Sequence, residues 1–387
     1  MLQGADSADL HWSIPLQIRS GPDAAPQSVL LTKDGETVRA GRWDEPLSVN
    51  AGAIGYYRVL YDEPTLQVNT KAFGSLPDGD RIALLDDEWA LVQSGAQKLS
   101  AYLALASSMG TDLDERAWSQ INGALAKIEY DERGTPGHSA FTAFACRILK
   151  PVAERLGWDT KPEENPGIQK LRRGVLGNLG DWGDAEVIAE ARRRFAAFVK
   201  DRNAIGPDNQ EMILGIVARH ADEATFQQLH AVAKSAHNET ELRRFYASLM
   251  LVRDSKLAEQ AARIALSDEI PAQAAAQRVL LILALADWHP LLGWNTFTAN
   301  SDMLMKPRSN FAPLFMARSL PPRFWKAVPL DQMEEWIRAH VPAGMAPELA
   351  RGMEAARFEV ALKKALVPEA DSYLEPKSDK SNAAALE

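Results

Sequence analysis

The sequence has almost no cysteine, no long hydrophobic run and no excess of basic residues, and each shortage excludes a class of protein. Cys146 is the single cysteine among 387 residues, so the chain can form neither an internal disulfide nor a multi-cysteine metal site. The longest apolar run, Val279 to Ala286, is too short to cross a bilayer. The net charge of −9 opposes phosphate binding, which needs a concentrated positive surface. We therefore expect neither a membrane span nor a nucleic-acid partner.

Common catalytic motifs are missing too. None of the seven histidines begins a His-Glu-x-x-His pattern, which would place two zinc ligands and a general base on one helix face. The sequence also has no Gly-x-Ser-x-Gly elbow, no phosphate-binding loop and no Gly-x-Gly-x-x-Gly turn. These absences weigh less against a dispersed Ser/His/Asp triad, whose members need no fixed spacing. We assign no catalytic, metal-binding or cofactor-binding residue to the chain.

Two local features favour packing or solvation over chemistry. Cys146 stands among apolar neighbours and is expected to be a small buried hydrophobe, because no activating base accompanies it. The basic run Arg192 to Arg194 lies in a helix-like segment beside Glu190, which is typical of a solvated helix face.

Two further clusters could suggest a metal site. His230 and His237 are seven residues apart and could share a helix face, but the helix start at Asn238 places His237 at a turn. Side chains of the acidic triplet Asp86-Asp87-Glu88 point about 100° apart on a helix and cannot converge on one ion. We predict a structural or interface role for the triplet, with one carboxylate paired to Arg81.

The first sixty or so residues have the period of short strands. Apolar residues alternate from His11 to Arg19, and Pro15 places that strand at an edge or a bulge. Asp34-Gly35 predicts a hairpin between Ser28 to Thr32 and Glu36 to Ala40. Two more candidate strands follow at Leu47 to Asn50 and Ile54 to Tyr61. We therefore predict a small β-sandwich over residues 1–64.

After Asp62 the period becomes helical. Ile82, Leu85, Trp89 and Val92 form a buried stripe, with Asp80 as the expected N-cap, and Leu99, Leu103 and Ala106 begin a second stripe. Helices then open near Asp222, Glu239, Ser255, Pro271 and Pro290, about every seventeen residues.

Such helices build hairpins that cannot cover their own apolar faces, so neighbours stack. The sequence predicts a mainly α protein, in which the small N-terminal β-sandwich is followed by an α-α superhelical, HEAT-like solenoid over residues 65–374. Residues 375–387 read as a disordered tail, and Asn382 to Glu387 resembles a cloning scar.

Two stretches carry a resemblance to a known family. One is Asn50, Gly55, Tyr57-Arg58-Val59 and Tyr61-Asp62, and the other is Asp80-Arg81 with Leu84-Leu85-Asp86-Asp87. They resemble the junction between the small β-sandwich and the helical C-terminal domain of aminopeptidase N-like zinc metallopeptidases. Trp12 to Leu16 is similar to a strand of the same sandwich, and Gln93-Ser94-Gly95 continues in register. The family's zinc helix and Gly-x-Met-x-Asn loop lie upstream of this junction and are absent here; Gly352-Met353-Glu354-Ala355 is a superficial echo of the loop.

The resemblance implies a non-catalytic role within a larger enzyme. The chain would be the C-terminal portion of a zinc-dependent aminopeptidase, inactive alone, closing the substrate chamber over a catalytic domain of the same polypeptide. Zinc would belong to that parent enzyme and no cofactor to this chain. An exposed apolar patch is expected where the catalytic domain is missing. The sequence does not decide between cytoplasm and periplasm.

Peptide substrates would then meet the inner face of the helical domain. A peptide carboxylate suits an arginine, and Arg308, Arg318 and Arg323 lie in the irregular segment Lys306 to Pro329. The residues alone do not choose among them, and surface charge is the simpler interpretation. Two alternatives stay open: a free-standing helical scaffold that binds a protein or peptide on its concave face, and a hydrolase with a dispersed triad.

Overall fold

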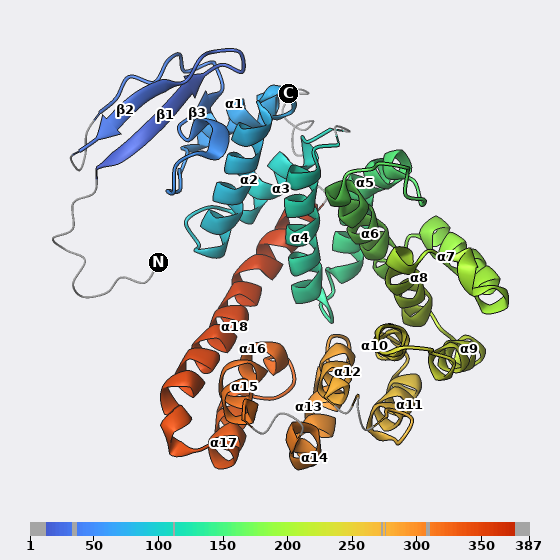
Figure 1. Cartoon of the computed structure of the whole chain (residues 1–387). Helices are drawn as coiled ribbons and strands as arrows, with labels where there is room; N and C mark the ends of the chain where they lie inside the picture. Colours follow the sequence, from blue (N-terminus) through green and yellow to red (C-terminus); the bar gives the residue numbers. More distant parts are fainter. Residues whose placement is uncertain are drawn as a thin grey trace, which may run out of the picture. The chain divides into compact units, whose positions relative to one another are not determined.

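A computed structural model of the chain describes residues 13–32, 37–110, 113–271, 274, 276–306 and 310–375. Strands occur only near the N-terminal end of the described residues, and helices follow through the rest, so the predicted mainly α class is confirmed (Figure 1). The chain forms two compact units, one of Met1–Val175 with Lys363–Glu387 and the other of Leu176–Leu362. The predicted boundary between residues 64 and 65 therefore falls inside the first unit, and that domain division stays a prediction.

The sheet of the first unit has the strand order β2-β1-β3 and is antiparallel. Its strands are β1 (Ile14–Ser20), β2 (Gln27–Leu31) and β3 (Leu47–Ser48). Pro15 lies opposite Leu30 of β2, whereas β3 pairs only with Arg19 and Ser20. Among the described residues, one edge of β1 is therefore unpaired at Pro15. Proline has no backbone N–H, and at this edge its absence costs the sheet no hydrogen bond.

Two of the five predicted strands are wrong. Residues 37–40 and 54–61 form no strand, and the Lys33-to-Gly35 hairpin lies outside the described residues. In the second segment, side chains bond the backbone in place of a neighbouring strand. Asn50 Oδ1 accepts the N–H of Gly55 at 2.7 Å, and its amide Nδ2 donates to the Gly55 carbonyl at 2.9 Å. The described residues consequently hold one sheet rather than the two layers of a sandwich.

In the first unit, the helices follow the three strands in the sequence. They are α1 (Glu63–Ala72), α2 (Asp78–Gln93), α3 (Leu99–Ser107), α4 (Glu115–Glu132), α5 (His138–Leu156), the start of α6 (Pro166–Asp181) and the end of α18 (Ala346–Leu374). Asp62 caps α1 by accepting the Thr65 N–H at 3.0 Å, and Asp114 caps α4 in the same way.

The α2 helix differs from its prediction at two points. Leu84, Leu85 and Val92 are its buried apolar residues, whereas the predicted Ile82 and Trp89 are only half-buried. Its N-cap is Pro77 and not Asp80, which lies inside the first turn. The second predicted stripe is confirmed, because Leu99, Leu103 and Ala106 are all buried.

The end of α18 packs onto helices that come much earlier in the chain. Glu369 Oε2 accepts the N–H of Leu99 at 2.6 Å and so caps α3, and the Tyr373 ring lies 5.7 Å from that of Phe144 on α5. This last part of the chain is therefore a structural element of the first unit.

The second unit is helical throughout its described residues. After the end of α6 it contains α7 (Ala185–Lys200), α8 (Pro207–Arg219), α9 (Glu223–Lys234), α10 (Glu239–Leu249), α11 (Ser255–Leu266), α12 (Gln277–Leu285), α13 (Pro290–Ala299), α14 (Ser301–Met305), α15 (Ala312–Arg318), α16 (Leu320–Phe324), α17 (Leu330–His340) and the first part of α18. The predicted helix starts near Asp222, Glu239, Ser255 and Pro290 are confirmed. The helix start predicted near Pro271 falls partly outside the described residues, and α12 begins at Gln277.

Helices that are consecutive in the sequence pack together in pairs, and some helices two apart in the sequence are also in contact. The α7–α8, α9–α10 and α11–α12 pairs are in contact, and α10 also packs against α8 and α12 (Figure 1). Phe226, Leu229 and Ala233 of α9 are buried in this stack, as predicted. The packing is that of helical hairpins, but the superhelical course predicted for residues 65–374 crosses both units and stays a prediction.

Within the described residues, no helix combines the length and the apolar character that a membrane span requires.

Candidate functional site

The segment between β3 and α1 is fastened to α2 by acidic side chains. We call residues 49–62 the junction segment. Asp80 Oδ1 of α2 accepts the Gly52 N–H at 2.6 Å, and its other oxygen lies 3.4 Å from Arg19 Nε on β1. Asp80 is 2% exposed, so the residue predicted as an N-cap is instead a buried anchor for the junction segment.

The acidic triplet has the predicted structural role but a different partner. Arg58 of the junction segment bonds Asp86 at 2.6 Å and Asp87 at 3.1 Å. Asp87 also accepts the Val59 N–H at 3.1 Å. The expected pair with Arg81 is wrong: Arg81 points to Asp78 at 2.5 Å and to Asp114 at 3.4 Å. The triplet therefore contacts the junction segment and not a residue of its own helix.

Glu88, the last residue of the triplet, is fully buried. Among the described residues, neither carboxylate oxygen has a hydrogen bond of regular geometry, although the Gln97 side chain lies close enough to affect it. Burial raises the pKa of Glu88 to about 7; the Gln97 side chain opposes this effect and the charge of Asp87 adds to it.

A cavity of about 360 Å³ opens between the junction segment and α2. Its lining includes Tyr56, Tyr57, Arg58 and Ile82, and the Tyr57 hydroxyl donates to the Val49 carbonyl at 3.0 Å. The cavity combines aromatic walls with one arginine that is shared by two lining carboxylates, Asp86 and Asp87, so it offers no free positive charge to a ligand.

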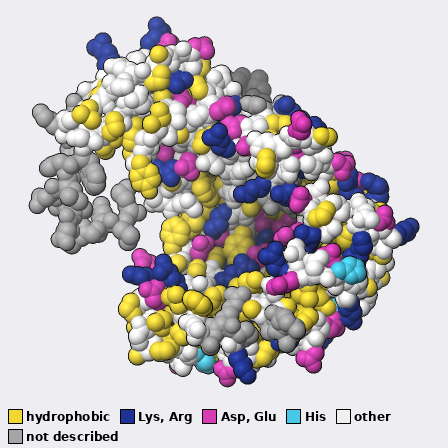
Figure 2. Space-filling view, in the orientation of Figure 1, with side chains coloured by type: hydrophobic (Ala, Val, Ile, Leu, Met, Phe, Trp, Pro, Cys, Tyr) yellow, Lys and Arg dark blue, Asp and Glu magenta, His cyan; other side chains and the backbone are white. Residues whose placement is uncertain are grey.

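Large apolar side chains are exposed on the junction segment and at two positions that precede it in the sequence. Tyr56 is fully exposed, Trp43 is 88% exposed and Ile54 is 77% exposed, and Leu60 and Leu30 are more than half exposed. Figure 2 shows hydrophobic side chains at the surface in the part of the molecule that Figure 1 assigns to the sheet and α2. An apolar surface of this kind is characteristic of an interface. We call these five residues the apolar face.

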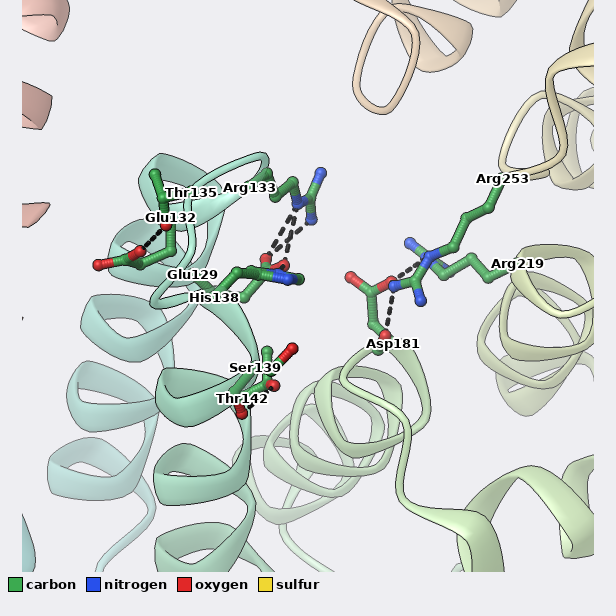
Figure 3. Close-up of polar contacts among 10 residues, drawn as sticks. All are labelled: Glu129, Glu132, Arg133, Thr135, His138, Ser139, Thr142, Asp181, Arg219 and Arg253. Atoms are coloured by element: carbon green, nitrogen blue, oxygen red, sulfur yellow. Dashed lines mark hydrogen bonds and ion pairs between the residues drawn. The ribbon is translucent and has the colours of Figure 1, made fainter. Parts of the chain in front are cut away.

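A second polar cluster joins α4 to α5 in the first unit. Glu129 is 1% exposed and accepts bonds from Arg133 Nε at 3.0 Å and from His138 Nε2 at 2.8 Å (Figure 3). Burial alone would raise the pKa of Glu129, but His138 and Arg133 outweigh it and hold the pKa at about 2. His138 directs the same ring nitrogen toward Glu129 that a Ser/His/Asp triad would use toward its serine, so this geometry does not activate the exposed Ser139.

A third cluster ties together three helix ends in the second unit. Asp181, at the end of α6, lies 2.8 Å from Arg219 Nε of α8 and 2.5 Å from the terminal nitrogen of Arg253 that follows α10 (Figure 3). Arg253 also lies over the Trp288 ring at 4.1 Å. Two cations share one buried carboxylate, which positions the turns at this edge of the helix stack.

The predicted arginine candidates are occupied by structural contacts or lie outside the described residues. Arg308 lies outside them. Arg318 pairs with Glu348 at 3.1 Å, and Arg323 bonds the Leu283 carbonyl through Nε at 3.2 Å. Neither arginine is thereby singled out for a peptide carboxylate.

Of the other local predictions, some are confirmed and others are wrong. Glu190 pairs with Arg193 and Arg194, so the basic run is an ion-paired helix face as expected. His230 Nε2 lies 2.6 Å from the Glu269 carboxylate, and the backbone N–H of His237 donates to the Glu241 carboxylate. Cys146, expected in the core, is only half-buried on α5.

Among the described residues, no three His, Cys, Asp or Glu side chains are grouped so that they could hold a metal ion. The donor set that a zinc peptidase needs therefore does not fit onto this part of the chain.

Sequence reasoning missed the two clusters centred on Glu129 and Asp181. Arg133 follows Glu129 at the helical i+4 spacing, so the sequence could have predicted that ion pair. Asp181 and Arg253 are 72 residues apart and had none.

Comparison with known proteins gives a consistent set of relatives. The profile of a family described as the ERAP1-like C-terminal domain matches residues 47–358. Aminopeptidase M1 of Arabidopsis thaliana is 30% identical over 234 residues, which cover 58% of this chain and 26% of that protein. Aminopeptidase M1-A of Oryza sativa subsp. japonica is 25% identical over 322 residues, or 81% of this chain and 36% of that protein. Tricorn protease-interacting factor F2 of Thermoplasma volcanium is 26% identical over 195 residues, 50% of this chain and 23% of that protein. The chain thus spans about a quarter to a third of the length of these relatives.

Proposed function

The chain belongs to the ERAP1-like C-terminal domain family, and on that premise we propose that it is the non-catalytic C-terminal portion of a zinc-dependent aminopeptidase. In this role it closes the substrate chamber over the catalytic domain and helps to bind peptides. The family match over residues 47–358 is the observation that carries the proposal.

The apolar face supports a missing neighbour. Trp43, Ile54 and Tyr56 are each at least 77% exposed, although tryptophan and isoleucine side chains stabilise a protein mainly when buried. Ile54 and Tyr56 belong to the junction segment, which α2 holds in place through Asp80 and Asp87. A catalytic domain of the same polypeptide that packs here would cover them.

Zinc would be held outside this chain. The described residues offer no suitable ligand group, so we assign the metal and the bond-breaking step to the remainder of the parent enzyme. This chain would shape the substrate chamber and contact the bound peptide. Asp181 would support that role by fixing the positions of the helix ends.

The test begins with the full-length gene product. Its intact mass and sequence should reveal an upstream segment with His-Glu-x-x-His. The chain alone should then hydrolyse no aminoacyl-p-nitroanilide, with or without added zinc. A full-length product that lacks the motif would overturn the proposal and favour a helical scaffold, and chelator-sensitive turnover by this chain alone would overturn it as well.

A variant pair tests the docking role of the apolar face. In the full-length enzyme, Trp43→Ser with Tyr56→Ser should weaken the association of the two portions and lower the thermal midpoint. The control is Phe358→Ser, an exposed apolar residue of α18 in the second unit. An equal effect of both changes would argue against a specific interface at the apolar face.

A further inference from the structure

A cavity of about 360 Å³ lies within the second unit, where residues of α7, α8 and α10 line it. Its apolar walls are Phe198 of α7, Phe245 of α10 and Ile205 between α7 and α8, all of them buried. The polar side chains that line it are those of Arg202, Asn203, Gln210, His237 and Glu241. Apolar walls combined with a few polar groups are the usual form of a small-molecule site.

Arg202, in the turn between α7 and α8, is a half-buried cation whose contacts are all with neutral groups. Its guanidinium lies over the rings of Phe198 and Phe245, 4.8 Å and 5.2 Å from their centres. Its Nη2 donates to the Ser235 hydroxyl and to the Val232 carbonyl. Its Nη1 is buried and has no hydrogen bond within the described part of the chain. A partly buried charge in this state is costly unless an anion pairs with it.

A second arginine adds positive charge beside the same cavity. Arg244 of α10 is half-buried, and its Nη1 donates at 2.5 Å to Oε1 of the lining residue Gln210. The acid in the lining is Glu241, whose Oε2 accepts the backbone N–H of His237 at 2.9 Å. Among the described residues Glu241 forms no ion pair with either arginine, and its charge acts on Arg202 only at longer range. Two cations therefore stand against one acid that is already bonded.

The surroundings of this cavity differ from those of other arginines in the unit. Arg219 and Arg253 are half-buried as well, but they share the carboxylate of Asp181. The start of α8 also favours an anion at the cavity, because its N-cap Gly206 lines the cavity and supplies no side-chain cap. The excess of positive charge is thus a property of this cavity, and an anion would balance it.

We propose that this cavity binds the oxyanion group of a small molecule, a phosphate or a carboxylate, through the guanidinium of Arg202, with Arg244 adding to the positive charge. A guanidinium donates hydrogen bonds to both kinds of oxyanion. The walls at Phe198, Ile205 and Phe245 contact the apolar remainder of the ligand. The proposal concerns the second unit by itself and does not depend on the assignment of the chain to a peptidase.

Calorimetric titration of the full chain with phenyl phosphate, phenylacetate and benzyl alcohol tests the proposal. At least one of the two anions should bind, and the tighter of them identifies the class of oxyanion. The neutral alcohol should bind at least roughly tenfold more weakly than that anion, because it brings no charge to the arginines. The proposal is wrong if neither anion binds at concentrations up to about 10 mM, or if the alcohol binds equally well.

Matched variants test whether the anion binds at this cavity. Arg202→Gln should weaken anion binding at least roughly tenfold, and Arg244→Gln by a smaller factor. The control Arg243→Gln, the same change at the exposed neighbouring position on α10, should leave the affinity unchanged. Should Arg202→Gln not fold, Arg202→Lys takes its place, because it keeps the charge but removes the planar fork and should also weaken binding. Affinity that does not change on replacement of Arg202, or that falls as much in Arg243→Gln, would overturn the proposal.

Discussion

The guanidinium of Arg253 lies over the indole ring of Trp288, 4.1 Å from the ring centre. The same guanidinium reaches Asp181 at 2.5 Å, so one side chain connects the end of α6 with the segment that follows α12. Arg219 approaches the same carboxylate from α8 at 2.8 Å. The helix stack is thus fixed at this edge by one shared acid as well as by apolar packing.

Replacing that acid should destabilise the second unit. Asp181→Asn leaves two arginines without their anion. Because Arg219 and Arg253 keep 22% and 25% of their side-chain surface exposed, we expect a loss of roughly 2 kcal/mol, less than for a fully buried pair. Urea denaturation measures it. The control Asp268→Asn, at an exposed position, should change stability by less than about 0.5 kcal/mol.

Two glycines of α6 should respond to alanine in opposite directions. A Cβ at Gly180 would lie 2.6 Å from Ile216 of α8, whereas a Cβ at Gly177 would find its nearest atom, on Met212, at 4.0 Å. Gly180→Ala should therefore destabilise by about 1–3 kcal/mol through overpacking. Gly177→Ala should stabilise by up to about 1 kcal/mol through helix propensity. Thermal unfolding of both variants checks the sign, and a stabilising Gly180→Ala would show that α6 and α8 are less closely packed.

Acid should weaken the cluster at Glu129. Its pKa of about 2 lies below the ordinary 4.5, so its stabilising contribution is present above pH 4.5 and is lost as the pH falls toward 2. We expect Glu129→Gln to cost about 3 kcal/mol at pH 7 and less than about half of that at pH 3. Stability curves at the two pH values test this, and a cost that does not change with pH would contradict it.

Arg172 should not tolerate lysine. Its side chain is 1% exposed; Nη1 donates to Glu164 at 2.6 Å and Nε donates to the Leu156 carbonyl at 3.2 Å. Lysine has no planar fork and cannot reproduce this pair of contacts. Arg172→Lys should cost roughly 2–4 kcal/mol by chemical denaturation. The exposed Arg193→Lys, on the ion-paired face of α7, is the control and should be nearly neutral.

Helix positions were readable because their signals are local. Asp222, Asn238 and Asp254 each cap the helix that the sequence predicts after them. The failure at residues 54–61 has a non-local cause: their alternating aromatic pattern suits a strand, but Asn50 and Asp87 take up backbone groups that a ladder would use.

The candidate site was less accessible to sequence reasoning. The triplet Asp86-Asp87-Glu88 was correctly interpreted as structural, but its partner Arg58 comes from a segment whose fold was mispredicted. Asp80 had a good local reason to be a cap, and its contact with Gly52, 28 residues away, outweighed it. Contacts of this separation leave no periodic trace in a single sequence.

The return of α18 onto α3 governs how the chain can be divided. Glu369 holds the N–H of Leu99 across 270 residues of sequence. A truncation before Lys363 would look like the trimming of a terminal helix, yet it would remove a capping group from the first unit and uncover Phe144. The described residues after Lys363 consequently belong with the first unit, and a fragment that keeps the cap of α3 must contain them.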